Sequence, residues 1–242
     1  MSRRPEHQAP PEIYYGEDEA RKYTTNSRMM EIQWTMSERA LELLALPDDS
    51  PCFLLDLGCG SGLSVARERD VEGDLLQGDL GQGLPFRAGA FDGAISISAL
   101  QWLCNADKIS HKPSKRLLAF FSSLYASLRR GARAVLQFYP ETPDQTELVM
   151  AQAMRAGFSG GLVVDFPNSS KAKKIFLVLM TGGAQVLPAA LGTRLSRQRP
   201  VRGKPVKHSR AWVEEKKERR RRQGKETARD SKFTARRRCG KF

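Results

Sequence analysis

The chain has 242 residues, a formal net charge of +13, and 40% apolar against 28% charged residues. This composition supports a packed core and excludes wholesale disorder, and the length allows one ordinary domain with or without a tail. The charge is uneven, because residues 194–242 hold 20 Lys and Arg against five Asp and Glu, whereas residues 1–193 hold 20 against 22. A uniformly basic, histone-like protein is therefore excluded, and a near-neutral body with a basic tail for a polyanionic partner is predicted.

Residues 1–16 are predicted to be a polar, proline-rich and mobile N-terminus, which lacks the apolar core of a signal peptide. The domain begins at residue 17 with a helix-rich segment to about residue 46, where apolar residues recur at three- and four-residue spacing. An apolar run at residues 52–57 then meets glycines at residues 58–62. This pattern predicts a buried strand that opens into a glycine-rich turn.

Strands and helices alternate through the rest of the body. Strands are predicted at residues 74–77, 91–98, 132–139, 162–166 and 174–180, and helices at residues 113–128 and 144–156. Alternation of this kind is typical of an α/β fold with a mostly parallel, doubly wound sheet, and the last two strands are expected to form an antiparallel hairpin.

The body is predicted to end near residue 190, which leaves residues 191–242 as a basic tail with a possible helix over 209–223. Residues 175–192 are uncharged, but their dense apolar part is short, so a strand and a loop are expected there and no membrane span. The cysteines lack CxxC spacing and the histidines are scattered, which predicts neither a metal site nor a disulfide framework. The cysteines are Cys52, Cys59, Cys104 and Cys239.

The glycine-rich turn holds Gly58, Gly60 and Gly62, and Asp56 stands two residues ahead of it. In an α/β sheet such a turn points backbone N–H groups at whatever lies over the strand's carboxyl end, and glycines let a ligand come close. A nucleotide-type ligand is favoured over a plain structural turn. The GxGxG spacing departs from the dinucleotide pattern, and the acid opposes a diphosphate but suits a cationic or zwitterionic ligand such as S-adenosylmethionine.

Several segments resemble the class I S-adenosylmethionine methyltransferases. LLDLGCGSG at residues 54–62 resembles their motif I, and GD at 78–79, FDGAIS at 91–96 and RAGF at 155–158 resemble later motifs. Longer segments are similar to one family within them, the eukaryotic small-subunit (18S) rRNA guanine-N(7) methyltransferases of the Williams–Beuren region. These segments are PPE (10–12), ARKY (20–23), GDLGQG (78–83), SISALQWLCN (96–105), GGLVVDFPNS (160–169) and SRAWVEEKKER (209–219).

The resemblance implies methyl transfer from S-adenosylmethionine to N7 of a guanine in small-subunit rRNA, with a role in pre-ribosome processing and export. It implies a pre-40S particle as substrate, a small zinc-binding activator subunit in a heterodimer, and a nuclear location (nucleoplasm and nucleolus) with some protein in the cytoplasm. The residues expected to hold the cofactor are Asp56, Gly58, Cys59 and Gly60 near its methionine part, Asp79 and Leu80 near the adenine, and Ser98. Asp79 could instead cap a turn, and Cys59 could be a small filler residue.

Methylation of a guanine ring nitrogen needs placement more than a general base, because the nitrogen offers a lone pair and loses no proton. No acid–base residue is therefore assigned. The target base is expected to stack on an aromatic side chain, for which Trp102 lies just past one predicted strand and Tyr139 lies at the end of the next. A place in the core is the alternative for each of them.

The body departs from the family pattern after the glycine-rich turn. Only 11 residues, 63–73, separate the turn from the strand predicted at residue 74. A βαβ crossover alone needs about 10–12 residues, so two crossovers and a strand cannot fit. The second strand of the fold and its ribose-binding acid are therefore expected to be missing, with an unpaired sheet edge as the result. Glu68, Asp70 and Glu72 have no spacing that supports them as substitutes.

The tail carries dense positive runs at residues 216–222 and 236–238. Such runs neutralise phosphates without sequence specificity and also serve as nuclear import signals, although a merely solvating tail is the alternative.

The main alternative to the methyltransferase hypothesis is a catalytically impaired, RNA-binding ribosome-assembly factor that keeps the scaffold and the tail. A small-molecule methyltransferase is a weaker third hypothesis, because it would leave the tail without a role.

Overall fold

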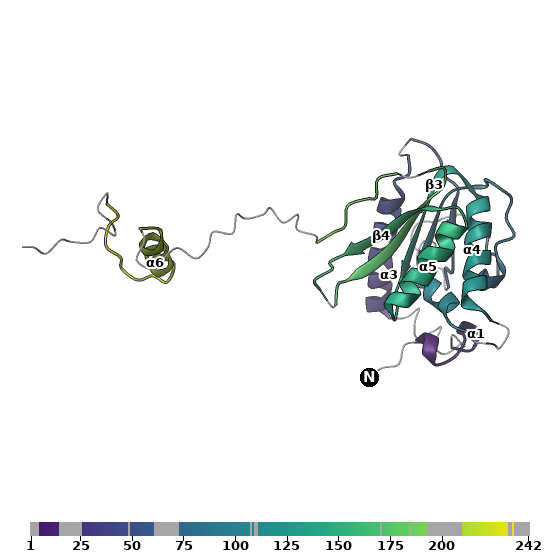
Figure 1. The fold of residues 1–242 in the computed structure, drawn as a ribbon, viewed down its shortest axis with the longest axis horizontal. Helices are drawn as coiled ribbons and strands as arrows, with labels where there is room; N and C mark the ends of the chain where they lie inside the picture. The colour runs from purple at the N-terminus through teal and green to yellow at the C-terminus, as the bar shows by residue number, and fades with distance from the viewer. Residues whose placement is uncertain are drawn as a thin grey trace, which may run out of the picture. The chain divides into compact units, whose positions relative to one another are not determined.

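The computed structural model describes residues 5–14, 26–47, 49–60, 73–106, 108, 111–169, 171–183, 185–192, 210–231 and 234. The chain divides into two units, Met1–Thr193 and Arg194–Phe242. The first unit holds a β-sheet and the helices that pack on it, and the second holds a single described helix, α6 (Arg210–Arg222) (Figure 1).

The described residues of the first unit form a five-stranded sheet in the order β1-β2-β3-β5-β4. The strands are β1 (Leu54–Asp56), β2 (Phe91–Ile97), β3 (Leu128–Phe138), β4 (Ser159–Asp165) and β5 (Lys174–Met180). β1, β2 and β3 are parallel, whereas β5 runs antiparallel to both β3 and β4 between them. The predicted parallel sheet with a late antiparallel hairpin is confirmed.

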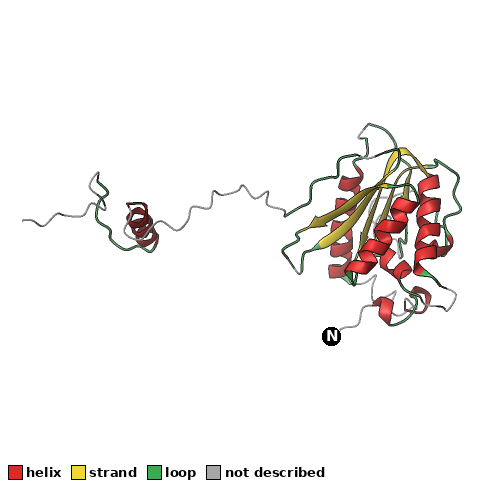
Figure 2. Cartoon of the chain, viewed as in Figure 1, coloured by secondary structure: helices red, strands yellow, loops and turns green. Residues whose placement is uncertain are grey.

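Helices cover both faces of this sheet (Figures 1 and 2). α3 (Ser27–Leu44) begins at the cap Asn26, whose side chain accepts a hydrogen bond from the backbone of Met29. Its buried side packs on one face of the sheet, and α4 (Pro113–Ser127) and α5 (Pro143–Arg155) pack on the other. The apolar periodicity of these helices thus produced two cores, one on each side, as a doubly wound sheet requires.

The strand predicted at residues 74–77 is wrong. Residues 73–79 form no strand, and Leu75 and Leu76 are 87% and 62% exposed. A strand forms where a neighbouring strand pairs with its backbone N–H and C=O groups. Within the described part of the chain, no strand pairs with residues 74–77, and β1 pairs with β2 alone. Residues 61–72, where the sequence predicts a missing second strand, lie outside the described residues.

The third strand of the sheet also begins earlier than predicted. The sequence predicts a helix at residues 113–128 and a strand from residue 132, which places Gly131 between the two elements, but Gly131 lies inside β3, which begins at Leu128 directly after α4. Gly131 has a φ of 86°, and its N–H donates to the carbonyl of Thr181 at 3.1 Å. The register against β2 shifts in this region, so the glycine accommodates an irregular pairing rather than a helix end.

A buried ion pair fastens the segment after β5 to the body. Arg39 of α3 meets Asp165 at the end of β4 with a distance of 2.9 Å between Nε and Oδ2. Arg39 also donates to the carbonyl of Ala189 at 2.9 Å, and Asp165 accepts from the backbone N–H of Leu191 at 2.7 Å. The uncharged stretch is therefore a strand followed by a tethered loop, and none of the helices described is long and apolar enough to cross a membrane.

Candidate functional site

The glycine-rich turn leaves β1 at a point that is fixed to β2. The backbone N–H of Leu57 donates to the carbonyl of Ile95 at 2.9 Å, and the hydroxyl of Ser96 donates to the carbonyl of Leu57 at 2.8 Å. Leu57 itself is buried. The turn therefore starts from a held position at the carboxyl end of the parallel strands, where α/β folds place their ligands.

The first two glycines of the turn have different surroundings. Gly58 has a φ of 73°, and a Cβ placed on it would lie 2.5 Å from the Cβ of Ala99 and 3.9 Å from a methyl group of Leu80. Gly60 has a φ of 57°, and none of the described residues comes within 4 Å of such a Cβ. Both backbones favour glycine. Gly58 is required by close packing, whereas none of the described residues fills the space beside Gly60.

These contacts bring together three segments predicted to hold the cofactor. The glycine-rich turn meets Leu80 at the start of η2 (Leu80–Gln82), and it meets Ala99, which directly follows Ser98. The segments are far apart in the sequence and converge because β1 and β2 are adjacent and parallel. Their role in binding a cofactor stays a prediction.

Asp79 caps the η2 turn. Its Oδ1 accepts the backbone N–H of Gly81 at 2.9 Å and lies 2.8 Å from a guanidinium nitrogen of Arg116 in α4. Burial opposes the ionisation of Asp79, but these two partners hold the pKa of its carboxyl below the ordinary value. The turn-capping role is thus present in the structure, and the adenine-side role of Asp79 and Leu80 stays a prediction.

Two thiols near this edge of the sheet are kept protonated. Burial, followed by the charge of Asp56, raises the pKa of Cys59, and burial together with Glu6 raises the pKa of Cys104 to about 11. Cys52 is also a free cysteine, and all three are partly buried. A raised pKa lowers the thiolate fraction, and with it the nucleophilic reactivity, of both thiols.

Ser98 ends the site-bearing edge of β2 in an unusual conformation. Its φ is 57°, in the left-handed region, and its hydroxyl donates to Oε1 of Gln137 at 2.8 Å. Nε2 of Gln101 donates to the carbonyl of Ser98 at 2.8 Å. Sequence reasoning selected Ser98 and missed both glutamines, although each is a lone amide in an apolar run, VLQFY or ALQWL.

The two aromatic candidates lie in different surroundings. Trp102 is partly buried in η3 (Leu100–Cys104), with its ring 6.3 Å from that of Tyr14 in α1 (Pro11–Tyr14). Tyr139 is also partly buried; its hydroxyl donates to the sulfur of Met36 at 3.5 Å and accepts from Lys174 at 2.9 Å. Neither ring is fully buried, and their use as a platform for a base stays a prediction. Gly62, Glu68, Asp70 and Glu72 lie outside the described residues.

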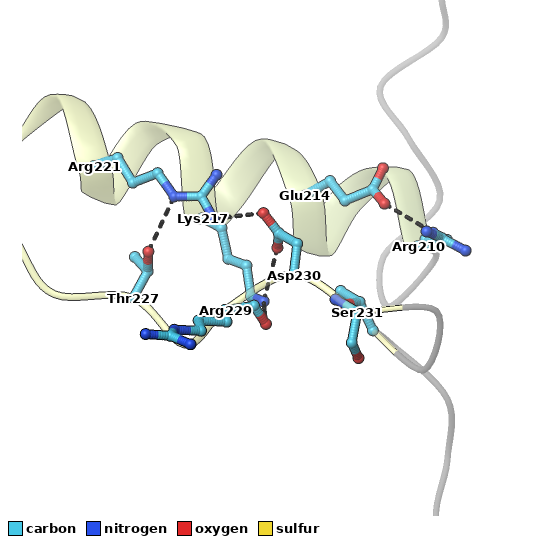
Figure 3. Close-up of polar contacts among 9 residues, drawn as sticks. Arg210, Glu214, Lys217, Arg221, Thr227, Arg229, Asp230 and Ser231 are labelled. Atoms are coloured by element: carbon cyan, nitrogen blue, oxygen red, sulfur yellow. Dashed lines mark hydrogen bonds and ion pairs between the residues drawn. The ribbon is translucent and has the colours of Figure 1, made fainter.

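In the second unit, α6 and the segment after it form a compact basic element (Figure 3). The chain turns at Gly224, whose φ is 70°, and returns so that Asp230 pairs with both Lys217 and Arg221. Lys217 also donates to the carbonyl of Arg229 at 3.2 Å. Hydrogen bonds from Arg221 and Lys217 lower the pKa of Asp230. Residues 210–231 hold nine Lys and Arg against five Asp and Glu, so this element keeps a positive charge after internal pairing.

Comparison with known proteins gives close relatives over the whole chain. The family model described as "Methyltransferase involved in Williams-Beuren syndrome" matches residues 191–240. The mouse (Mus musculus) 18S rRNA (guanine-N(7))-methyltransferase is 53% identical over 100% of this chain and 99% of its own length. The Arabidopsis thaliana 18S rRNA (guanine-N(7))-methyltransferase RID2 is 50% identical over 100% of both chains.

A Saccharomyces cerevisiae relative, the 18S rRNA (guanine(1575)-N(7))-methyltransferase, is 44% identical over 99% of both chains. The comparison with the mouse protein extends over 277 residues, whereas this chain has 242. Some positions of the mouse protein therefore have no counterpart in this chain.

Proposed function

The chain belongs to the family of 18S rRNA (guanine-N(7))-methyltransferases, and we propose that it transfers the methyl group of S-adenosylmethionine to N7 of a guanine in small-subunit rRNA. The full-length identity to relatives from mouse, plant and yeast carries this proposal. The convergence of the glycine-rich turn, η2 and the Ser98 segment at one edge of the sheet supports it.

The residues at this edge fit the cofactor. None of the described residues fills the space beside Gly60, which would give a ligand access to the backbone of the turn, and Asp56 at the end of β1 would supply a negative charge for the ammonium group of the methionine part. Leu80 and the capped Asp79 would border the adenine, and Ser98 would close the edge from β2. When bound, S-adenosylmethionine supplies an electrophilic methyl group on sulfur.

The remaining task of the protein is to place the guanine. N7 attacks with its lone pair and loses no proton, so alignment of the two reactants supplies the rate gain, about 7–11 kcal/mol in favourable cases. Trp102 and Tyr139 are the side chains proposed to hold the extruded base by stacking. No general base is required of this chain.

The basic tail supports an RNA substrate of large size. Lys and Arg side chains that neutralise phosphates release counterions, so the tail is proposed to bind rRNA of the pre-40S particle with strong salt dependence. The same basic runs are proposed to direct the protein to the nucleus. A small zinc-binding activator subunit is proposed as a further partner.

The proposal is tested by titrating the purified chain with S-adenosylmethionine in a calorimeter, with and without the activator subunit, and by assaying methylation of an 18S rRNA fragment. Asp56→Ala should abolish cofactor binding, whereas the control Asp144→Ala, in the first turn of α5, should bind as the wild type does. A wild-type chain that binds RNA but no cofactor, even with the activator present, would instead establish a non-catalytic assembly factor.

A further inference from the structure

Two buried glutamines interrupt the apolar interior where β2 and β3 end. Gln137 lies opposite Ile97 in the β2–β3 pairing and is fully buried between Leu136 and Phe138. Gln101, in η3, is 7% exposed. A buried amide destabilises a fold unless hydrogen bonds replace those it made with water. These two side chains therefore need a reason to be there.

Within the described residues, both amides bond to Ser98 alone. Gln137 accepts the Ser98 hydroxyl at 2.8 Å, and Gln101 donates to the Ser98 carbonyl at 2.8 Å. The other ends of the two amides, Nε2 of Gln137 and Oε1 of Gln101, are buried and have no hydrogen-bond partner in that part of the chain. An unpaired buried group costs about 1–3 kcal/mol, so the free ends of these two amides destabilise the folded protein. What the two glutamines provide in return is their pair of hydrogen bonds to Ser98.

Ser98 needs that hold because of its backbone. A φ of 57° is uncommon for a residue with a Cβ and raises its energy. The backbone N–H of Ser98 also donates to the Gln137 carbonyl at 3.0 Å, so Ser98 is fixed at three of its polar atoms. A relaxed Ser98 would redirect the chain at the end of β2.

The segment after Ser98 makes this direction important. Ala99 lies directly against Gly58 of the glycine-rich turn, so close that a Cβ on Gly58 would be 2.5 Å from it. η3 then begins at Leu100 and carries Trp102. The conformation of Ser98 therefore determines both the contact under the turn and the starting point of the helix that bears the aromatic ring.

We infer that Gln137 is a positioning residue: through the Ser98 hydroxyl it holds Ser98 left-handed and so sets the place of Trp102 relative to the glycine-rich turn. Gln101 secures the same residue from the other side. This inference rests on the proposed function, because it assigns the turn to the cofactor and Trp102 to the base. It does not require either glutamine to contact a ligand.

A set of four variants tests the inference. Gln137→Met keeps the length of the side chain and removes its amide, Ser98→Ala removes the hydroxyl and keeps a Cβ, and Ser98→Gly removes both the hydroxyl and the strain. The fourth variant combines Gln137→Met with Ser98→Gly. Gln152→Met is the matched control, because Gln152 is also a buried glutamine but lies in α5 and bonds to Arg155.

Gln137→Met and Ser98→Ala should each lower kcat and weaken S-adenosylhomocysteine binding about tenfold, the equivalent of one well-placed hydrogen bond. The melting temperature of Gln137→Met should not fall, because an unpaired buried Nε2 is removed with the amide. Whatever the activity of Ser98→Gly itself, Gln137→Met should have no further effect on kcat or S-adenosylhomocysteine binding in that background, because glycine adopts the left-handed conformation freely. The control should match the wild type.

An equal loss from Gln137→Met in the wild-type and Ser98→Gly backgrounds would overturn the inference and assign the amide to a ligand. Hydrogen exchange of the amides of residues 98–103 separates this result from failure of the proposed function, since it needs no activity. Exchange there should be faster in Gln137→Met than in the wild type and normal in the control. Unchanged exchange would overturn the inference even if the enzyme is active.

Discussion

Two strands of the sheet, β5 and β1, differ strongly in burial and pairing. β5 lies inside the sheet with strands on both sides, and its residues from Phe176 to Met180 are at most 1% exposed. β1 has three residues, all only partly buried, and within the described residues it pairs with β2 alone. The glycine-rich turn directly follows β1, the less buried of the two strands. Ligand-binding segments commonly come from the less stable part of a fold, because they must adjust when the ligand binds.

The aromatic residues beside β1 show the same difference. Phe53, just before the strand, is 62% exposed although its ring stacks on that of Phe91 at 5.0 Å. In contrast, Phe176 of β5 and Phe138 of β3 are almost fully buried. The side chains around β5 are therefore the better buried ones, and the candidate site lies at the less buried edge at β1.

The largest expected effect is on the core around β5. Phe176→Ala should lower the free energy of unfolding by about 3–5 kcal/mol, because it leaves a cavity among fully packed side chains. Leu55→Ala in β1 should lower it by about 1–2 kcal/mol, since Leu55 is only partly buried. Urea unfolding of the two variants gives the comparison, and equal losses would show that β1 is as well supported as β5.

The next effect concerns the loop after β5. Arg39→Met should lower the free energy of unfolding by about 3 kcal/mol, because it leaves the carboxylate of Asp165 buried without its cation. The exposed Arg28→Met, in the first turn of the same helix α3, serves as the control and should change stability by less than about 0.5 kcal/mol. Chemical unfolding measures both, and a neutral Arg39→Met would show that this pair does not fasten the loop.

Substitutions in the glycine-rich turn should separate packing from ligand access. Gly58→Ala should lower the free energy of unfolding by about 2–3 kcal/mol, from left-handed strain and the collision with Ala99. Gly60→Ala meets no described neighbour, so only the strain of about 1 kcal/mol remains, while its methyl group enters space that none of the described residues fills. Calorimetry should therefore show weaker cofactor binding in the folded Gly60→Ala protein.

If Gly60→Ala bound the cofactor with wild-type affinity, the space above the turn would not be used by the ligand. Equal destabilisation by the two substitutions would contradict the difference in packing between Gly58 and Gly60.

The smallest expected effect is a pH dependence at Asp79. Its pKa is lowered from 3.8 in the folded protein, so its contribution to stability is present above that value and is lost as the pH falls through the folded pKa. The contribution should be below about 1 kcal/mol, because the side chain is 37% exposed and water screens its pairing with Arg116. As the pH is lowered from 6 to 2, the melting temperature of Asp79→Asn should fall less steeply than that of the wild type. An identical dependence of the two melting temperatures on pH would argue against the pairing.

Most of the fold could be predicted from the sequence because it depends on local periodicity. The apolar spacing of α4 and α5 and the unbroken apolar run of β5 each indicated the element that formed. The strand expected at residues 74–77 failed for the opposite reason, since Leu75 and Leu76 needed a neighbouring strand that periodicity cannot supply. The start of β3 was missed because Gly131 is typical of a helix end as well as of an irregular strand.

The sequence by itself determined the family, the alternation of strands and helices, the basic tail and the glycine-rich turn after Asp56, all of which depend on neighbouring residues. Only the tertiary structure decided that Gly58 packs against Ala99, that Gln137 holds Ser98, and that Arg39 pairs with Asp165. These contacts join residues 39 or more positions apart, and adjacent strands and the helix across them bring such residues together. Hydrogen bonding and packing act through space, so a pattern along the chain cannot show which buried polar groups will meet.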